Sequence, residues 1–323
     1  MNRGPSLKQI KEMTVRWMPA DWSNSALRVH TDTTDFFQID YGDVILLDGR
    51  PYLIRNSAKE GRFGLDEEIK HWVKRAVDLT RGEMCLVKLV FYEKFLSTVG
   101  NIEFECFRSP RKEARILELV KSHPNFMHGI SAVDEKDNTV RVLEHISGKA
   151  LSNYIADLVQ NHETYFHETL PGILRHYIEC LDAIRYLHDH GEKHGDIRRD
   201  HILIDKKTNR YRWIDFDYNF RHRENIYGYD LFGLGNVLIY IVGKGDVLLI
   251  DLKRRNPELL SRLSETDLNI IFRNRVANLR KVYPYIPDTL NRVLLHFSNG
   301  ANWFYERVDQ LIHDLRPVIA DMH

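Results

Sequence analysis

Residues 192–205 read EKHGDIRRDHILID, and this stretch decides how the fold is interpreted. His194, Gly195 and Asp196 stand immediately before a short apolar run, which is the pattern of a polar loop that enters a buried strand. His201 follows Asp196 by five residues. A loop aspartate of this kind can accept a proton or hold a metal ion, so its role depends on the charged residues that accompany it elsewhere in the chain.

The sequence on both sides of this loop predicts a mainly helical C-terminal half. Upstream, apolar residues between Leu174 and Leu187 recur at helical spacing and form one stripe. Downstream, HILID at 201–205 and RYRWIDFD at 210–217 predict two short strands joined by a polar turn. Helical patterns return at Tyr229 and continue almost to the C-terminus, so we expect helices around one buried hairpin.

The N-terminal half predicts mainly strands. Apolar runs on either side of DGRP (48–51) and of DLTRGE (78–83) predict two β-hairpins, because each turn carries a glycine. From Pro110 the apolar spacing becomes helical, and TVRVLEHI (139–146) returns to a strand pattern. One short helix is expected around residues 8–15, within an otherwise polar segment.

These patterns predict an α+β chain in two lobes. Residues 1–38 are expected to form an N-terminal extension, residues 39–146 a small β-rich N-lobe, and residues 147–323 a mainly helical C-lobe. A length of 323 residues with 43% apolar composition is sufficient for a large core.

The charge balance and composition argue against several classes of function. Lys plus Arg equals Asp plus Glu, 46 against 46, so no basic field points to nucleic acid or to an anionic membrane surface. The longest uncharged apolar run, 237–242, is far too short to span a bilayer, and the N-terminus lacks the apolar core of a signal peptide. Three cysteines without metal-ligand spacing predict a reducing, cytoplasmic setting.

Four charged residues are of the types that phosphoryl transfer requires. Lys88 lies in the apolar run CLVKLVF, where a lysine is costly unless a carboxylate or phosphate meets it. Glu113 lies in the next expected helix, Asp196 opens the loop before HILI, and Asp215 ends the strand YRWID. In phosphoryl transfer a lysine neutralises phosphate oxygens, one carboxylate orients that lysine, another receives the hydroxyl proton, and a third holds magnesium.

With these residues in this order, the sequence resembles the protein kinase fold over most of its length. The resemblance implies that Lys88 pairs with the phosphates of ATP and that Glu113 is the partner of Lys88. HGDIRRDHIL looks like the catalytic loop with Asp196 as the base, and IDFD looks like the metal-binding motif with Asp215 as a ligand of Mg²⁺.

The resemblance also implies how the chain contacts the nucleotide. Leu143 matches the gatekeeper, and Glu144 and Ile146 match the hinge residues whose backbone groups bond adenine. Leu86 stands where a small alanine is usual, so it narrows the adenine slot. The residues expected to contact the nucleotide are Val73, Leu86, Lys88, Glu113, Leu143, Glu144, Ile146, Leu203, Gly61 and Gly64.

Gly61 and Gly64 belong to KEGRFG (59–64), which resembles the latter half of the glycine loop that covers phosphates. Glycine allows backbone amides to approach phosphate oxygens without a Cβ in the way. Three acidic residues follow in LDEEIKH (65–71), and they would repel a nucleotide unless they point outward. A solvated hairpin tip is therefore the alternative for this segment.

The expected metal site departs from the kinase pattern at His201. This histidine replaces the asparagine that binds the second metal, and imidazole is a poor ligand for Mg²⁺. The spacing of aspartate and histidine is similar to that of bacterial lipopolysaccharide kinases, in which a histidine stands at this position. Asp217, two residues beyond Asp215, could supply an oxygen ligand, or it could cap a turn.

The segment between Asp215 and Asp230 is short and contains no Ser or Thr. Gly195 also replaces the arginine that would read a phosphate in this segment, so control by phosphorylation here is not expected. Asp230 resembles the aspartate that ties the backbone of the catalytic loop in place.

Cations cluster in sequence near the loop. Arg198 resembles the catalytic-loop cation that meets the γ-phosphate. The other members of the cluster are Arg199, Arg221, His222 and Arg223. They could bind an anionic acceptor, or they could form salt bridges with Asp200 and Glu224.

Three functions fit these residues. The first is an ATP- and Mg²⁺-dependent kinase acting on Ser or Thr hydroxyls of proteins, with Lys88, Asp196 and Arg198 in catalysis. The second has the same chemistry with a sugar, lipid or other small-molecule hydroxyl as acceptor, which the short segment after the metal-binding motif favours. The third is a pseudokinase that binds or scaffolds, which Leu86 and His201 favour.

Overall fold

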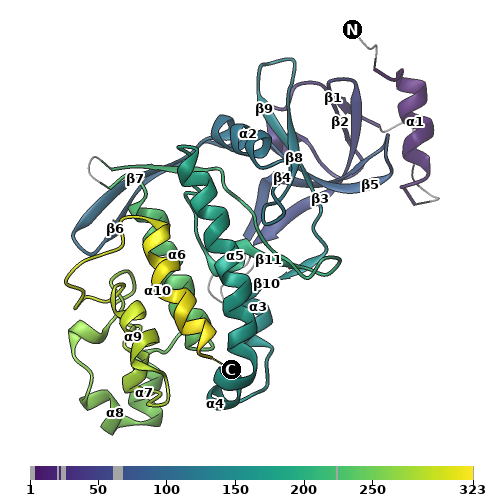
Figure 1. Cartoon of the computed structure of the whole chain (residues 1–323). Helices are drawn as coiled ribbons and strands as arrows, with labels where there is room; N and C mark the ends of the chain where they lie inside the picture. The colour runs from purple at the N-terminus through teal and green to yellow at the C-terminus, as the bar shows by residue number, and fades with distance from the viewer. Residues whose placement is uncertain (1–3, 20–21, 23–26, 61–67, 223–224, 323) are drawn as a thin grey trace. The chain divides into compact units, whose positions relative to one another are not determined.

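The structure, a computed structural model, divides into two units (Figure 1). The residues described are 4–19, 22, 27–60, 68–222 and 225–322. The first unit comprises residues 1–93, 109–122 and 127–146, and the second comprises residues 94–108, 123–126 and 147–323. Residues 94–108 therefore group with the second unit, although they lie within the N-lobe expected at 39–146.

A seven-stranded sheet forms the centre of the first unit, in the order β1-β2-β3-β4-β5-β9-β8. Its strands are β1 (Val29–His30), β2 (Val44–Leu47), β3 (Arg50–Glu60), β4 (Glu68–Asp78), β5 (Glu83–Lys88), β8 (Gly129–Val133) and β9 (Thr139–Glu144). Among the described residues, β1 and β2 are the only parallel neighbours in this sheet. Both hairpins expected from the sequence are confirmed, because β2 pairs with β3 and β4 pairs with β5.

The turn between β2 and β3 explains the first hairpin. Asp48 and Gly49 have positive φ angles of 48° and 75°. A type I′ turn needs positive φ at both central residues, and Asp-Gly is among the pairs that adopt it most readily. The strands that it joins bury apolar side chains in one core cluster, which includes Ile45, Tyr52 and Ile54.

In the part of the first unit that the structure describes, two α-helices accompany the sheet. Helix α1 (Leu7–Val15) begins with a capping box formed by Ser6 and Gln9, and Ile10 of this helix packs into a cluster with core residues of β2, β3 and β4. Helix α2 (Pro110–Leu119) begins at Ser109, whose side chain accepts a hydrogen bond from the Lys112 N–H at 3.3 Å. Both helices are confirmed where the sequence predicts them.

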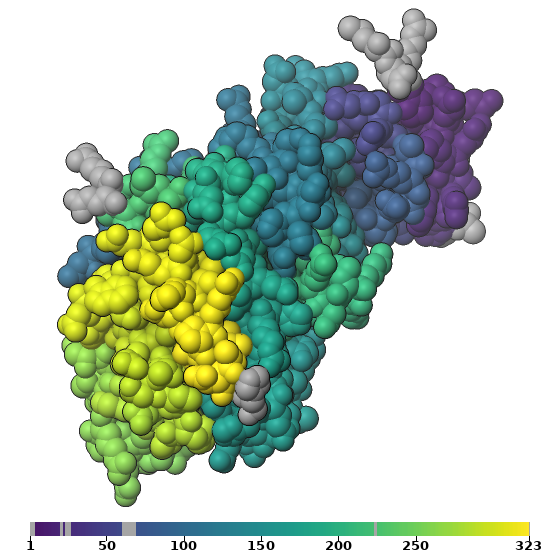
Figure 2. All heavy atoms as spheres, in the orientation of Figure 1, coloured from purple at the N-terminus to yellow at the C-terminus, as the bar shows by residue number. Residues whose placement is uncertain are grey.

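The second unit is mainly helical, which confirms the α+β class. Its helices are α3 (Leu151–Ala156), α4 (His162–Thr164), α5 (Leu170–Asp189), α6 (Gly228–Val242), α7 (Leu249–Arg255), α8 (Pro257–Ser261), α9 (Asp288–Leu295) and α10 (Val308–Ala320). The apolar stripe predicted upstream of the loop is the buried face of α5. Helix α10 runs beside α5 in Figure 1 and lies at the surface of the second unit in Figure 2, where it is yellow. Among the helices of the described residues, none has the length and hydropathy that a membrane span needs.

Two three-stranded sheets flank the catalytic-type loop in the second unit. The first contains β10 (Gly148–Ala150), β11 (Ile202–Asp205) and β12 (Tyr211–Trp213), so the hairpin predicted downstream of the loop is confirmed. The extended run predicted to continue to Asp217 stops at Trp213. Asp215 has a positive φ of 60°, and an extended strand cannot continue through such a residue.

The second of these sheets is not predicted by the sequence patterns. It has the order β13-β7-β6, with β6 (Lys94–Val99), β7 (Ile102–Arg108) and β13 (Tyr218–Arg221). Strands β6 and β7 form a hairpin that turns at Gly100, where φ is 59°. Strand β13 lies in the segment between Asp215 and Asp230, so this segment is built into a sheet.

Candidate active site

Lys88 and Glu113 meet in the first unit, as the sequence predicts. The Lys88 ammonium donates a hydrogen bond to Glu113 Oε1 at 3.1 Å, and both side chains are almost completely buried. Arg141 on β9 donates from Nε to the other oxygen, Oε2, at 3.0 Å. These three side chains, here called the lysine cluster, carry two positive charges and one negative charge. Two cations placed close together in this way suit an anionic ligand such as a phosphate.

Sequence reasoning missed Arg141, although a signal was present. Arg141 interrupts the apolar run TVRVLE in the same way that Lys88 interrupts CLVKLVF. The two residues are direct neighbours in the pairing of β5 with β9. Their side chains therefore lie on one face of the sheet, where Glu113 of α2 reaches both.

The same face carries three of the residues expected to contact the nucleotide. Val73 is paired with Lys88 across β4 and β5, and Leu86 is paired with Leu143 across β5 and β9. Because side chains two residues apart on a strand point to the same face, Leu86 lies on the face of Lys88. Leu143 and Val73 are buried, whereas Leu86 remains partly exposed. The lysine cluster thus has an apolar surface beside it.

The other expected nucleotide contacts fall in four places. Glu144 ends β9, where its backbone N–H donates to the His128 carbonyl at 3.0 Å, and Ile146 follows directly after the strand. Leu203 lies on β11 of the second unit. Gly61 and Gly64 lie outside the described residues, together with the acids at 66 and 67.

In the second unit, His201 lies between two of the predicted carboxylates. Its Nδ1 atom is 2.9 Å from the main-chain oxygen of Asp196 and 3.5 Å from the Oδ2 atom of that residue. Its Nε2 atom is 3.8 Å from Asp215 Oδ2. The structure therefore brings Asp196, His201 and Asp215 together, from a loop and two strand ends that are separated in sequence.

The surroundings of Asp196 favour its action as a base. Burial raises the pKa of the Asp196 carboxyl above its usual range. His201 and Arg198 oppose this rise, and two neighbouring carboxylates add to it. A carboxylate with a raised pKa holds a proton more strongly, so it is better suited to receive one from a hydroxyl.

Asp230 fixes the backbone of the loop, as the sequence predicts. Its two carboxylate oxygens accept hydrogen bonds from the backbone N–H groups of His194 and Gly195, each at 2.8 Å. His188 Nε2 lies 3.1 Å from Oδ2. Burial opposes ionisation of this carboxyl, but the hydrogen bond from His188, the nearby imidazoles and the Gly195 N–H together lower its pKa. Asp230 is thus a buried anion that holds the residues directly before Asp196.

The predicted metal ligands fall into two environments. Asp215 adopts left-handed backbone geometry, with a φ of 60°, which is uncommon for a residue with a side chain. Asp217 instead meets Arg108, whose Nη1 atom donates to both Asp217 oxygens at 3.0 and 2.9 Å. This contact competes with a metal for the same oxygens. Within the described parts of the chain, no three His, Cys, Asp or Glu side chains form a group that could hold a metal by themselves.

The cations predicted near the loop have protein partners in the structure. Arg198 bonds both oxygens of Asp200, from Nε at 3.0 Å and from Nη2. Arg199 donates instead to Asp246 at 2.9 Å. The guanidinium of Arg221 lies 4.9 Å from the centre of the Phe107 ring, and residues 223 and 224 lie outside the described residues. The γ-phosphate role of Arg198 stays a prediction.

Known proteins resemble the central part of the chain. A family model described as protein kinase domain matches residues 72–226. CBL-interacting protein kinase 1 of Oryza sativa subsp. japonica is 30% identical over 158 residues, which are 49% of this chain and 30% of that protein. CBL-interacting serine/threonine-protein kinase 17 of Arabidopsis thaliana is 27% identical over 135 residues, or 42% of this chain and 28% of that protein.

A further relative is named as a ribonuclease and not as a kinase. The 2-5A-dependent ribonuclease of Mus musculus is 32% identical over 215 residues, which are 64% of this chain and 25% of that protein. The chain spans less than a third of the length of each of these curated relatives. The match to the protein kinase domain, the β-rich first unit and the helical second unit agree on one conclusion: the chain has a protein kinase-like fold.

Proposed function

We propose that this protein is an ATP- and Mg²⁺-dependent phosphotransferase that acts on Ser or Thr hydroxyls of proteins. The observation that carries the proposal is the lysine cluster, in which two buried cations share one carboxylate beside an apolar sheet face. An adenine nucleotide has the matching chemistry, because it joins an apolar base to anionic phosphates. The relatives named as serine/threonine-protein kinases support the choice of acceptor.

In this proposal, a small set of residues in the first unit binds the nucleotide. Lys88 neutralises oxygens of the α- and β-phosphates, and Glu113 holds Lys88 in the required orientation. Leu143 and Val73 contact the adenine ring, and the backbone groups of the hinge after β9 bond its edge.

Asp196 orients the acceptor hydroxyl and receives its proton. The hydroxyl oxygen then forms a bond to the γ-phosphorus, and the bond from that phosphorus to the bridging oxygen breaks, leaving ADP. Arg198 contacts the γ-phosphate. Asp230 takes no part in proton transfer, and it keeps Asp196 in position through the loop backbone.

The donor set fits a metal that is carried in by the nucleotide. Mg²⁺ takes most of its ligands from phosphate and water in such sites, so one or two protein oxygens are sufficient. Asp215 supplies a hard oxygen donor, and His201 adds a nitrogen donor that Mn²⁺ accepts more readily than Mg²⁺ does. When bound, the metal would neutralise charge on the phosphates.

The test is transfer of label from γ-labelled ATP to an array of Ser- and Thr-containing peptides. We expect transfer with Mg²⁺ and faster transfer with Mn²⁺, and a loss of roughly 100-fold or more in Asp196→Asn. Asp189→Asn, an exposed carboxylate at the end of α5, is the matched control and should transfer normally. Equal transfer by Asp196→Asn and the control would remove Asp196 from the mechanism.

Two alternatives are outcomes of the same assay. Transfer to sugars or lipids but to no peptide would favour a small-molecule acceptor, which the short segment after Asp215 also fits. Absence of transfer with retained nucleotide binding would favour a binding module. The mouse relative named as a ribonuclease favours the binding module, since similarity in this region extends to a protein named for another activity.

The three cysteines, free and buried, fit the cytoplasmic setting predicted from the sequence.

A further inference from the structure

The segment between Asp215 and Asp230 is held by a part of the chain that lies more than a hundred residues before it. Strand β13 pairs antiparallel with β7, from Tyr218 opposite Arg108 to Arg221 opposite Glu105. Strand β6 forms the other edge of β7. The hairpin of β6 and β7, here called the brace, therefore provides the main-chain partner for the segment.

A buried ion pair joins the brace to the residue before β13. Arg108 and Asp217 are only 2% and 3% exposed, and Nη1 of Arg108 donates to both Asp217 oxygens. The guanidinium of Arg108 also lies 4.0 Å from the centre of the Tyr218 ring. The position of this ion pair fixes the direction in which the chain leaves Asp215.

The opposite side of β13 packs on the loop that carries Asp196. Gly195 has a φ of 86°, and a Cβ atom at this position would lie 1.9 Å from the Tyr218 carbonyl oxygen. Lys193 donates from Nζ to the Phe220 carbonyl at 3.0 Å. Residues directly before Asp196 therefore touch β13 through backbone atoms, and movement of β13 would move the loop.

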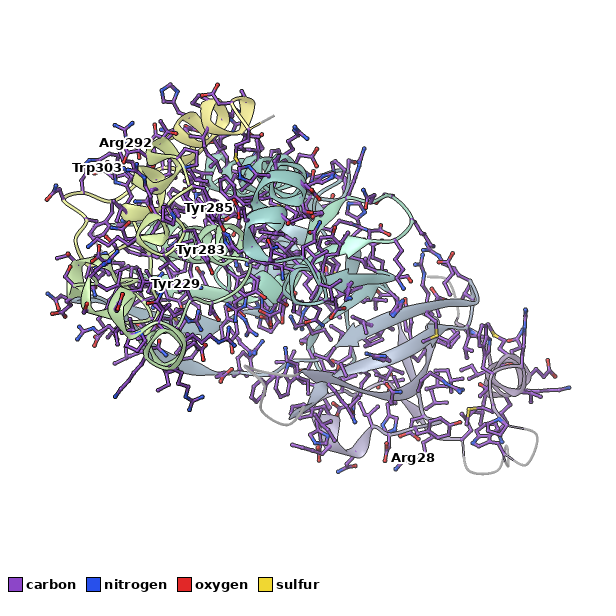
Figure 3. All side chains as sticks on the ribbon, turned by 90° about the horizontal axis from the view of Figure 1, so that it is seen from below. Arg28, Tyr229, Tyr283, Tyr285, Arg292 and Trp303 are labelled. Atoms are coloured by element: carbon purple, nitrogen blue, oxygen red, sulfur yellow. The ribbon has the colours of Figure 1, made fainter. Side chains whose placement is uncertain are left out.

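The brace is anchored to helix α6 as well. Phe104 of β7 is fully buried, and its ring centre lies 5.2 Å from that of Tyr229 and 5.8 Å from that of Phe220. Ser97 of β6 donates to the Tyr229 hydroxyl at 3.3 Å. Figure 3 labels Tyr229, which precedes Asp230 in the second unit. The brace thus contacts both ends of the segment that follows Asp215.

We propose that the brace holds the segment after Asp215 in its working position without phosphorylation, and that Arg108 and Asp217 are positioning residues for the reaction. This inference rests on the proposed function. It adds that contacts within the chain, and not phosphorylation, keep the segment after Asp215 in position. Residues 216–229 contain no Ser or Thr, and glycine stands where an arginine would read a phosphate. The Arg108–Asp217 pair supplies in the unmodified chain the kind of fixed charge contact that a phosphate would otherwise provide.

The test compares Arg108→Gln, Arg108→Lys and Lys94→Gln in the full chain. Lys94→Gln removes an exposed ion pair with Glu105 in the same hairpin, so it is the matched control. Both bonds to Asp217 start from one nitrogen, and the ammonium of Arg108→Lys can therefore replace them. The measurements are hydrogen–deuterium exchange at residues 218–221, and kcat and KM for ATP per folded molecule.

For Arg108→Gln we expect exchange at 218–221 to rise about tenfold or more, and kcat to fall roughly 100-fold with little change in KM for ATP. Arg108→Lys should restore most of the protection from exchange and most of the kcat. Lys94→Gln should match the wild type in both measurements. If Arg108→Gln does not fold, the double variant Arg108→Met/Asp217→Leu removes both charges together and carries the same expectations.

If hydrogen–deuterium exchange at residues 218–221 is the same in Arg108→Gln as in the wild type, the proposal that the brace holds this segment is wrong. Faster exchange with unchanged kcat per folded molecule would overturn the positioning role, because a purely structural pair alters only the folded fraction. A wild-type chain that binds ATP but never turns it over would contradict the proposed function and the catalytic role of the brace, while the exchange data still decide whether the brace holds the segment.

Discussion

Each unit buries an arginine against a carboxylate, and the two arrangements differ in how the carboxylate is shared. In the lysine cluster, Glu113 accepts hydrogen bonds from two cations, from Lys88 at Oε1 and from Arg141 at Oε2. In the brace, one nitrogen of Arg108 donates to both oxygens of Asp217. The first arrangement brings two cations together, which suits an anionic ligand, whereas the second ties the brace to the residue before β13. This difference separates a contact that suits phosphate binding from one that positions a segment of the chain.

The largest loss of stability that we expect from this comparison comes from replacing Glu113. Glu113→Gln removes the carboxylate that two buried cations share, so we expect a loss of about 4 kcal/mol or more in the free energy of unfolding. Urea denaturation followed by circular dichroism measures this loss. Glu118→Gln, an exposed position on the same helix, is the control and should change stability by less than about 0.5 kcal/mol. Equal stability of the two variants would mean that the cluster is not charge-coupled.

The next largest loss of stability is expected from a substitution in the brace. Arg108→Gln leaves Asp217 buried without its main positive partner, and we expect a loss of about 3 kcal/mol in the free energy of unfolding. Arg108→Met/Asp217→Leu removes both charges and should recover most of that loss in the same denaturation assay. A double variant as unstable as the single one would show that packing over Tyr218, and not charge balance, holds the pair.

Lys88 gives a smaller effect on stability. Lys88→Met leaves Glu113 with its hydrogen bond from Arg141, so we expect the free energy of unfolding to change by less than about 1 kcal/mol. The same denaturation assay detects this difference from Glu113→Gln. A loss as large as that of Glu113→Gln would contradict the interpretation that Arg141 alone is a sufficient partner for Glu113.

The smallest effect is the dependence of stability on pH at Asp196. Burial raises the pKa of this carboxyl, so the folded state binds its proton more tightly than the unfolded state does. Stability from this group is therefore present at low pH and falls as pH rises from the unfolded value of about 3.9 through the raised value in the folded state. Asp196→Asn removes this term, and its stability relative to the wild type should increase across that interval in denaturation curves. A constant difference between the two proteins would contradict the raised pKa.

Local patterns in the sequence were sufficient for the elements that carry the site. The helical stripe of α5 and the hairpins across Asp48–Gly49 and Asp78–Glu83 follow from spacing and turn residues. The pair of Lys88 with Glu113 follows from the resemblance to the protein kinase fold. Each of these signals lies within a short window of the chain, or in the resemblance of motifs in a fixed order.

The brace could not be predicted in this way, because its determining contacts are distant in sequence. Arg108 and Asp217 are 109 residues apart, and nothing in either local pattern identifies the other. Asp217 therefore resembled a spare metal ligand next to Asp215. Strand β6 leaves Phe95 and Leu96 exposed, so it lacks the clear alternation of a half-buried strand. The requirement for glycine at 195 likewise arises from the Tyr218 carbonyl, which approaches it only in the folded chain.

The most direct test of the account is calorimetric titration of ATP with Mg²⁺ into the wild-type chain and Lys88→Met. The account predicts binding by the wild type and an affinity lower by roughly 100-fold in Lys88→Met, with both proteins equally folded, because the Lys88 ammonium is proposed to contact phosphate oxygens. Equal affinity in the two proteins, or no binding by the wild type, would contradict the claim that the lysine cluster is a phosphate site.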